Sequence, residues 1–383
     1  MTSQSSPLIF VHNSLPIGGA EQLRLAVCRE LLRREIPFRI CALECASTIG
    51  EELMDMGCAV DVLGTKQWIS DVRVWWRLLA YLKKHRPAVV QSALFEANTH
   101  SRWVASWAKI PLLVCEEHGL DYRRHWWHAK LDELLQQRAD VVLTVSHAVY
   151  DYMRSSAHIQ PEKLQVLHNC IDPLPLQQPD VASLRDFFGI EPQRMVIGHV
   201  GALKEEKGHR LLFQSFQQLM QQGHDIQLLL VGDGPMRVEL ELYAQELGIA
   251  DAVTFAGSRR DMQACFQSMD LFAFPSVNEA LGIALQEAMW MGLAVVASDQ
   301  GGMSELIEHG QDGLLVPLHD RAALTAALDG LLKDKRLRQT LGEAAHEKIK
   351  RHYLPKVYVD QLFQLYREKY AQKKLARPAW LEE

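Results

Sequence analysis

Residues 195–201 read MVIGHVG and residues 226–232 read IQLLLVG, two short apolar runs that each end at a glycine. Runs of this length and composition are typical of buried parallel strands, and helical patterns lie between them. The same kind of run recurs further along the chain as VTFAG (253–257), LFAFPS (271–276) and AVVASD (294–299). This alternation of strand and helix predicts an α/β domain with a doubly wound parallel sheet.

The first half of the chain repeats the pattern. Its apolar runs are LIFV (8–11), FRICAL (38–43), AVVQSAL (88–94), LLVC (112–115) and VVLTVS (141–146). Between the halves lies IDPLPLQQPD, whose three prolines disfavour a helix or a central strand, so a linker is expected over about 171–182. We therefore predict two Rossmann-like doubly wound domains facing across a cleft, over residues 1–178 and 190–355.

Length and composition restrict the function classes. A chain of 383 residues suits two domains of ordinary size. The formal net charge of -6 argues against a nucleic-acid partner. The start of the chain lacks a basic segment before its apolar run, and no stretch is long and apolar enough to span a bilayer, so we expect a cytoplasmic protein.

The segment PSVNEALGIALQEAMWMG (275–292) combines two carboxylates with a glycine. Glu279 follows a predicted strand, and Glu287 falls eight residues later, inside the helix that is expected to begin near Leu281. Gly282 would let backbone N–H groups approach an anion at the helix N-terminus. Carboxylates accept hydrogen bonds from the vicinal hydroxyls of sugars. One interpretation of the segment is therefore a ligand site in which the helix N-terminus binds a phosphate and the two glutamates on either side of it bind hydroxyls. A solvated helix with ordinary acidic residues is the other.

Other strand ends carry similar features. Lys207 stands at a loop-to-helix junction in GALKEEKGHRLL (201–212), where it could contact a diphosphate, although most lysines are simply solvated. Gly18 and Gly19 open a helix after the first strand, and GGMSEL (301–306) follows a strand in the same way. Glycines at several strand ends favour a common anionic ligand.

His118 is the histidine best placed for chemistry, because it follows the strand LLVC directly. A histidine that packs in the core or caps an element is the alternative. His12, His147 and His168 also lie at strand ends, which leaves the choice open. Asn169 and Arg259 could line the same region and are secondary candidates.

Several motifs are absent. The chain contains no Asp-x-Asp, the short carboxylate pair that would hold a divalent ion against a diphosphate, so no metal site is expected. It contains no Walker-type loop. VGDGPMR (231–237) has Arg237 where a dinucleotide fingerprint has its third glycine, so a dehydrogenase is only weakly supported.

Taken together, these blocks resemble the family 4 retaining glycosyltransferases of the GT-B fold. The resemblance covers nearly the whole chain and is most specific in the segment with Glu279 and Glu287, which have seven residues between them in the Glu-x7-Glu pattern. It implies transfer of a sugar from a UDP-, GDP- or ADP-sugar, without a cofactor, to a glycan or lipid-linked acceptor. It also implies a role in cell-surface polysaccharide or lipopolysaccharide synthesis.

The resemblance further implies residue roles. Glu279 would contact the hydroxyls of the donor sugar, Glu287 the ribose, and Lys207 the departing diphosphate. His118 would lie near the reacting sugar and the acceptor, and together with Lys207 and Glu279 it forms the predicted catalytic set. The remaining donor-binding residues would be Gly18, Gly19, Lys204, Arg259, Asn278, Leu281, Gly282 and Ile283. The final helix, over about 356–376, would pack back on the first domain.

The chain departs from the family at residue 202. Members often have an arginine directly after the glycine of the first strand of the second domain, whereas this chain has Ala202. Lys204 or Arg259 would have to substitute, or stabilisation of the leaving group would be weaker. Two alternatives therefore stay open: a nucleotide-sugar epimerase of the same fold, and a donor-binding protein with weak or no turnover.

Tryptophans in the first half raise the question of a membrane. RWVASWAK (102–109) and RRHWWHAK (123–130) interleave aromatic and basic residues, as at a membrane interface. Filling of the core or of a sugar-binding groove explains such tryptophans equally well. Peripheral membrane contact is thus one expectation, and the oligomeric state is open.

Overall fold

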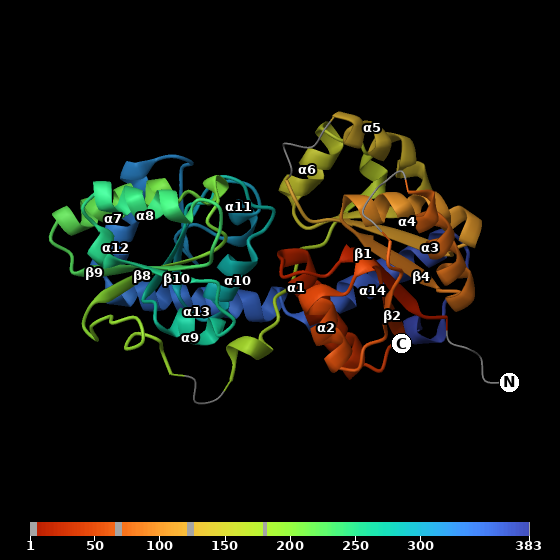
Figure 1. The fold of residues 1–383 in the computed structure, drawn as a ribbon, viewed down its shortest axis with the longest axis horizontal. Coiled ribbons are helices and arrows are strands. Elements are labelled where there is room, and N and C mark those ends of the chain that lie inside the picture. The colour runs from red at the N-terminus through yellow and green to blue at the C-terminus, as the bar shows by residue number, and fades with distance from the viewer. Residues whose placement is uncertain (1–5, 66–70, 121–125, 179–181, 383) are drawn as a thin grey trace. The chain divides into compact units, whose positions relative to one another are not determined.

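A computed structural model of the protein describes residues 6–65, 71–120, 126–178 and 182–382 (Figure 1). The chain forms two compact units. The first unit comprises residues 1–171 and 355–383, and the second unit comprises residues 172–354. Within the described ranges, no helix is both long enough and apolar enough to cross a bilayer.

The first unit is built on seven parallel strands in the order β3-β2-β1-β4-β5-β6-β7. The strands are β1 (Leu8–Ser14), β2 (Phe38–Cys45), β3 (Val60–Val62), β4 (Val89–Ala93), β5 (Leu112–Glu117), β6 (Val141–Thr144) and β7 (Leu164–Val166). Its helices are α1 (Gly19–Arg33), α2 (Ser47–Asp55), α3 (Val72–His85), α4 (Phe95–Ala108), α5 (Trp126–Leu135), α6 (His147–Ser155) and α14 (Pro355–Gln372).

The second unit has six parallel strands in the order β10-β9-β8-β11-β12-β13. The strands are β8 (Met195–Val200), β9 (Ile226–Val231), β10 (Val253–Gly257), β11 (Leu271–Phe274), β12 (Ala294–Ser298) and β13 (Leu314–Val316). Its helices are α7 (His209–Gln221), α8 (Arg237–Glu246), α9 (Met262–Gln267), α10 (Ile283–Trp290), α11 (Met303–Leu306), α12 (Arg321–Lys333) and α13 (Lys335–His352).

Local sequence explains where several of these helices begin. The side chains of Asp71, Asp320 and Asp334 accept hydrogen bonds from backbone N–H groups in the first turns of α3, α12 and α13. Helix α14 begins at Pro355, whose fixed φ suits a first helical position and which lacks the N–H that would be unpaired there.

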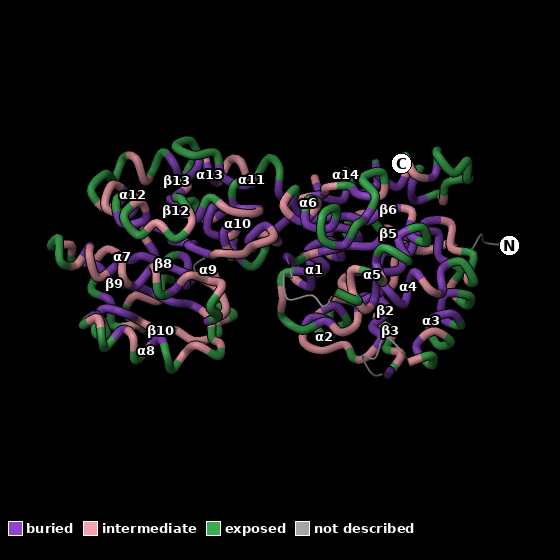
Figure 2. Tube along the Cα trace, turned by 90° about the horizontal axis from the view of Figure 1, so that it is seen from above, coloured by how far each residue is buried: buried purple, intermediate pink, exposed green. Residues whose placement is uncertain are grey.

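Both sheets are covered on their two faces, as their apolar strands require. The central strands of each unit are buried over most of their length, and most exposed residues lie on the outer helices and loops (Figure 2). In the first unit, Tyr358, Leu362 and Tyr366 of α14 join the core formed by β1, β4, β5 and α1. The last helix of the chain therefore completes the core of the first unit.

The prediction of two doubly wound parallel sheets is confirmed, with differences at the edges. Strands β3, β7 and β13 have only three residues each and are missing from the sequence-based prediction. The predicted strand 271–276 ends at Phe274, because Pro275 has no N–H to extend the ladder. The predicted helix start near Leu281 lies at Ile283 in the structure.

The predicted domain boundary at residue 178 differs from the structure. The two units divide after Ile171, and the chain from Asp172 onward belongs to the second unit. Gln178 shows why: its N–H donates to Oε1 of Gln263 at 2.7 Å, and its carbonyl accepts from Nε2 of the same residue at 3.0 Å. Prolines exclude this segment from a sheet, but they do not prevent it from packing on α9.

In each sheet the strand order reverses at one point. In the first unit β1 lies between β2 and β4, and in the second unit β8 lies between β9 and β11. At each of these points, the loops that follow the two neighbouring strands leave toward opposite faces of the sheet. In open α/β sheets this leaves a crevice at the carboxyl ends of the two strands, and ligands bind there. The candidate residues lie at these two points.

Candidate functional site

An ion pair joins the loops that follow β8 and β11 in the second unit. The Lys207 ammonium donates to Oε1 of Glu279. Both side chains keep partial contact with solvent, at 19% and 14% exposure respectively. Lys207 also lies 5.6 Å from the centre of the Phe274 ring. Two of the predicted catalytic residues, 72 positions apart in the chain, are thus brought together at the carboxyl edge of the second sheet.

Gly208 makes this approach possible. It has a φ of +71°, and a Cβ there would lie 2.1 Å from the Pro275 carbonyl oxygen. Only glycine therefore lets the loop after β8 pass this close to the loop after β11. A hydrogen bond of 2.7 Å from the Val277 N–H to the Glu206 carbonyl fixes the same crossing.

Helix α10 begins beside the ion pair. Gly282 precedes it with a φ of +88°, and no side chain in the described part of the chain caps this end of the helix. The N–H groups of its first turn have no acceptor within the helix, and the helix dipole favours an anion there. The Gly302 N–H donates to the Glu279 carbonyl at 3.1 Å, which ties the loop after β12 to the same place. Leu281 is buried and Ile283 partly buried.

Glu287 lies in α10 with a pKa that is far from its usual value. Burial, followed by the like charge of Asp172, raises the pKa of this carboxyl from 4.5 to about 7, although the residue keeps some contact with solvent. Asp172 comes from the segment that was predicted to be a linker. A carboxyl with this pKa is close to half ionised at neutral pH. A ligand that binds one protonation state more tightly would shift Glu287 toward that state.

The candidate substitutes for the missing arginine differ from each other. Lys204 is exposed, and within the described ranges it forms no ion pair. Arg259 donates to both oxygens of Asp261, from Nε at 2.8 Å and from Nη2 at 2.5 Å. Its guanidinium also lies 5.2 Å from the centre of the Phe187 ring. Since Arg259 already has a carboxylate partner, Lys204 is the better candidate to supply positive charge near Ala202.

Two buried histidines lie under the Lys207 loop and are missing from the sequence-based prediction. The rings of His199 and His209 are 4.8 Å apart, and His199 Nδ1 lies 2.9 Å from the Ala273 carbonyl. Burial and the charge of Lys207 lower the pKa of His209 to about 4, and burial lowers the pKa of His199 well below 6.5. Neutral rings support the loop without adding a second charge beside Lys207.

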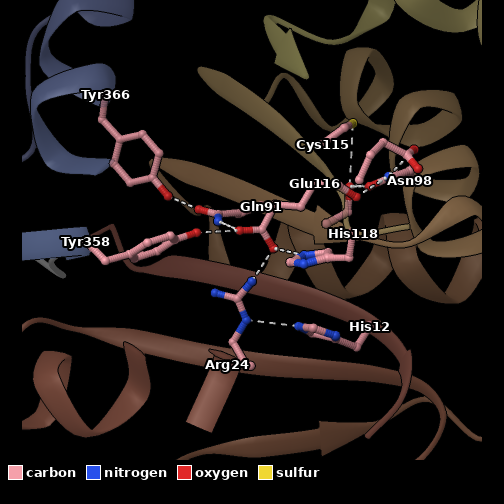
Figure 3. A network of polar contacts seen from close by, with 11 residues as sticks. His12, Arg24, Gln91, Asn98, Cys115, Glu116, His118, Tyr358 and Tyr366 are labelled. Carbon is pink, nitrogen blue, oxygen red and sulfur yellow. Dashed lines mark hydrogen bonds and ion pairs between the residues drawn. The ribbon is translucent and has the colours of Figure 1, made fainter. Parts of the chain in front are cut away.

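A buried polar network occupies the corresponding edge of the first unit (Figure 3). At its centre is Glu116, at the end of β5, which accepts hydrogen bonds from Arg24 of α1, Gln91 of β4 and, at 3.2 Å, the hydroxyl of Tyr358 in α14. Arg24 also donates from Nε to His12 Nε2 at 3.0 Å. Burial opposes ionisation of Glu116, but the positive charge of Arg24 and the contact with His118 lower its pKa to about 2. Glu116 is therefore a carboxylate at neutral pH.

His118 contacts this network. Its Nε2 lies 3.4 Å from Oε2 of Glu116, and only 6% of its side chain is exposed. Its other ring nitrogen, Nδ1, is buried without a hydrogen-bond partner among the described residues. A carboxylate on one side favours the tautomer that carries the proton on Nε2, which leaves Nδ1 as an acceptor.

Gly18 and Gly19 lie at the start of α1, as predicted. Gly19 is the first residue of the helix and Gly18 precedes it in an extended conformation. The Glu21 carboxylate folds over this end, because a Cβ on Gly18 would lie 2.5 Å from Glu21 Oε2. Burial raises the pKa of Glu21. A carboxylate in the first turn competes with an external anion for the same N–H groups.

The other candidates of the first unit have different surroundings. His12 is fully buried, and burial together with Arg24 lowers its pKa well below 6.5, so it is a neutral member of the network. The rings of His147 and His168 lie 6.1 Å apart, beside a small hollow between β7 and α14. Asn169 is buried next to them. His12 and His118 both touch the Glu116 network, and the Nδ1 of each is buried without a hydrogen-bond partner among the described residues. His118 is the better candidate because 6% of its side chain is exposed, whereas His12 is fully buried.

Two family models match this chain, one on each side of the boundary between the units. The model described as Glycosyltransferase Family 4 matches residues 17–173. The model described as Glycosyl transferases group 1 matches residues 180–348. Between them they match the second sheet, every strand of the first sheet except β1, and all the predicted catalytic and donor-binding residues, whereas His12 in β1 lies outside the matched residues.

Characterised relatives match over part of their length. The N-acetyl-alpha-D-glucosaminyl L-malate synthase of Bacillus anthracis is 28% identical over 66% of this chain and 67% of its own length. The alpha-D-kanosaminyltransferase of Streptomyces kanamyceticus is 31% identical over 61% of each chain. The chain thus spans between about three fifths and two thirds of the length of these two relatives.

Solved structures match over nearly the whole chain. Anabaena Alr3699/HepE in complex with UDP-glucose has a TM-score of 0.83 at 22% identity, covering 94% of this chain and 99% of that one. WaaG, a glycosyltransferase involved in lipopolysaccharide biosynthesis, has a TM-score of 0.70 at 19% identity, covering 91% of this chain and 97% of that one. At these identities the likeness establishes the fold.

Proposed function

Because the chain belongs to the family 4, group 1 glycosyltransferases of the GT-B fold, we propose that it transfers a sugar from a nucleoside-diphosphate sugar to a glycan or lipid-linked acceptor, with retention of configuration and without a metal ion. The observation that carries the proposal is the Lys207–Glu279 pair beside the N-terminus of α10. A cation, a carboxylate and an uncapped helix end suit the phosphates and hydroxyls of such a donor.

Binding of the donor is assigned to the second unit. The N–H groups of Gly282 and Ile283 would hold the distal phosphate, with Leu281 and Asn278 in the same loop. Glu279 would accept hydrogen bonds from sugar hydroxyls, and Glu287 from those of the ribose. The likeness to a structure that contains UDP-glucose supports a nucleotide-sugar donor but does not identify the base.

Departure of the leaving group places negative charge on the diphosphate. The bond between the anomeric carbon and the phosphate oxygen breaks through an oxocarbenium-like state, as in glycoside chemistry generally. Lys207 and the helix end at Gly282 would stabilise that charge, which is preorganised electrostatic catalysis. Lys204 would supply the second cation that Ala202 does not. Because these groups provide the positive charge, the proposed reaction proceeds without a metal.

The roles in the first unit rest on His118. With its Nε2–H directed at Glu116, Nδ1 can accept a hydrogen bond from a hydroxyl of the acceptor or the sugar. Glu116 does not itself reach a substrate in this proposal; it holds the ring and its tautomer. Arg259 keeps its predicted donor-binding role, with Asp261 as the carboxylate that a donor would have to displace. The donor-binding role of Gly18 and Gly19, in the first unit, stays a prediction.

The retaining outcome is proposed with attack by the acceptor from the face that the diphosphate leaves. The departing phosphate would accept the proton of the acceptor hydroxyl. This choice follows from the family resemblance, and the anomeric configuration of the product, measured by proton NMR, tests it directly. An inverted product would remove the retaining mechanism while leaving glycosyl transfer in place.

A panel of UDP-, GDP- and ADP-sugars tests the proposal as a whole. We expect release of nucleotide diphosphate from one donor when glycan or lipid-linked acceptors are added, and the same rate in excess chelator. A rate that falls to background with chelator would contradict metal independence. Conversion of the donor to an isomer without an acceptor would favour the epimerase instead, and binding without turnover would favour a donor-binding protein impaired at Ala202.

A further inference from the structure

A hollow of about 840 Å³ lies in the first unit, away from every candidate residue named above. It is bordered by the C-terminal ends of α3 and α4 and by the segment that follows α14. Ser6, Ala88 and Pro111 are among its lining residues, and β1, β4 and β5 begin one or two residues after them. The hollow is therefore at the amino edge of the sheet, whereas His118 and Glu116 lie at the carboxyl edge.

The charged residues that line the hollow are all positive. Lys83, Arg86, Lys109 and Arg377 line it, and none of its fifteen lining residues is Asp or Glu. The whole chain has a net charge of -6, so this concentration of cations is a local feature. Within the described ranges Lys83, Arg86 and Lys109 form no ion pair, whereas nearby Lys373 is paired with Asp140 at 2.8 Å.

The backbone holds two of these cations in an uncommon conformation. Arg86 follows α3 with a φ of +45°, and Lys109 follows α4 with a φ of +55°. Helix ends of this kind favour glycine. Cations near helix C-termini interact favourably with the helix dipole, which explains a positive charge but not the hollow between them.

Apolar side chains border the same hollow. Trp107 is 50% exposed and Leu375 is 40% exposed, and both line it. Trp103, by contrast, stacks on Trp75 at 5.3 Å between ring centres, and the Arg138 guanidinium lies 4.5 Å from the centre of the Trp103 ring. The segment 102–109 therefore uses one tryptophan for packing and presents the other to solvent. Part of the second aromatic segment, residues 123–125, lies outside the described residues.

We infer that this hollow binds the phosphate head groups of an anionic phospholipid bilayer, so that the first unit docks on a membrane through the amino edge of its sheet. Unpaired lysine and arginine side chains attract anionic lipid, and an exposed tryptophan favours the level of the head groups. Charge complementarity selects a bilayer surface with negative charge over a neutral one. The inference is independent of the donor site, which lies on the second unit.

Sedimentation of the full chain with lipid vesicles tests it. We expect binding to vesicles of phosphatidylglycerol mixed with phosphatidylcholine, and none to phosphatidylcholine alone. The double variant Arg86→Asn/Lys109→Asn keeps residues that tolerate a positive φ, and should lower the partition coefficient about 25-fold, since each cation contributes about fivefold. The control Lys335→Asn/Arg336→Asn removes two exposed cations from α13 and should bind like the wild type.

Three results would overturn the inference. The first is the absence of binding to the anionic vesicles, and the second is equal binding by the wild type and the Arg86/Lys109 variant. The third is an equal loss of binding in the α13 control, which would indicate that anionic lipid attracts cations anywhere on the protein rather than at this hollow. If the Arg86/Lys109 variant does not fold, Lys83→Gln/Arg377→Gln changes the same hollow without touching a residue of positive φ. Trp107→Ala should weaken binding to anionic vesicles in the same assay.

Discussion

Replacement of Glu116 by glutamine is the perturbation whose effect on stability follows most directly from the structure. The variant keeps the shape of the side chain and removes its charge. Arg24 would then be a fully buried guanidinium without its carboxylate, because its side chain is 0% exposed and that of Glu116 only 2%. Gln91 and Tyr358 both donate to Oε1 of Glu116, and Arg24 donates to Oε2. A glutamine has one accepting oxygen and one donating NH2 group, so it cannot accept hydrogen bonds from all three partners in these positions.

The expected loss of stability is about 3–5 kcal/mol, the usual cost of removing one partner from a buried ion pair. Two contacts of Arg24 remain and place the estimate near the lower end. Its Nε still donates to His12 at 3.0 Å, and its guanidinium lies 3.7 Å from the centre of the Phe10 ring. For a unit of about 200 residues, 3 kcal/mol corresponds to a fall in the melting temperature of about 6–12 °C.

Differential scanning calorimetry of the full chain measures this effect. Glu368→Gln is the matched control, because Glu368 is an exposed glutamate on α14 in the same unit, and we expect it to melt within about 1 °C of the wild type. Tyr358→Phe removes a single hydrogen bond to the carboxylate and should cost about 1.5–3 kcal/mol. A Glu116→Gln protein that melts together with the Glu368→Gln control would refute the assignment of a buried, ionised Arg24–Glu116 pair.

Three further predictions concern the second unit. Lys207→Ala should lower kcat by about 10²–10³ with little change in donor affinity, as measured by steady-state kinetics, because the charge develops in the transition state; a change confined to KM would contradict its role. Donor affinity, measured by calorimetry, should rise with pH up to about 7 and then level off, because the ionised form of Glu287 accepts the ribose hydrogen bonds and its pKa is about 7. Glu287→Gln should remove this pH dependence, and a wild-type protein whose donor affinity does not change with pH would argue against the assignment. Gly282→Ala should destabilise the protein by about 1–2 kcal/mol in urea unfolding and weaken donor binding, because the residue has a φ of +88° and its Cβ would lie 3.2 Å from the Phe274 ring; unchanged stability would show that the loop adapts.

The architecture could be read from the sequence because its signals are local. Most residues in the central strands of both sheets are apolar, a pattern that is typical of buried parallel strands, although β4 includes Gln91 and Ser92 and β8 includes His199. The three-residue strands β3, β7 and β13 give no such signal, since a run of three residues has no measurable period. The boundary at Ile171 depends on the contact between Gln178 and Gln263, which no local pattern encodes.

The donor loops could be predicted for the same reason, because Glu279, Gly282 and Glu287 lie in one short segment. The pairing of Lys207 with Glu279 required the strand order, which places β8 next to β11. His12 and His118 could be named from the sequence, but the Glu116 network that they contact is missing from the sequence-based prediction, although a charged residue inside the apolar helix segment LRLAV, at Arg24, is a usable signal. The members of the network come from α1, β4, β5 and α14, and Tyr358 is 242 residues away from Glu116 in the chain.

Binding of nucleoside diphosphates to the wild type and to Glu287→Ala tests the central claim most directly, namely that the carboxyl edge of the second sheet is a donor site. In isothermal titration calorimetry we expect one of UDP, GDP and ADP to bind the wild type. Loss of hydrogen bonds to a charged group should weaken that binding about 10- to 100-fold in the variant. The absence of binding by all three nucleotides, or equal affinities for the wild type and Glu287→Ala, would contradict the account.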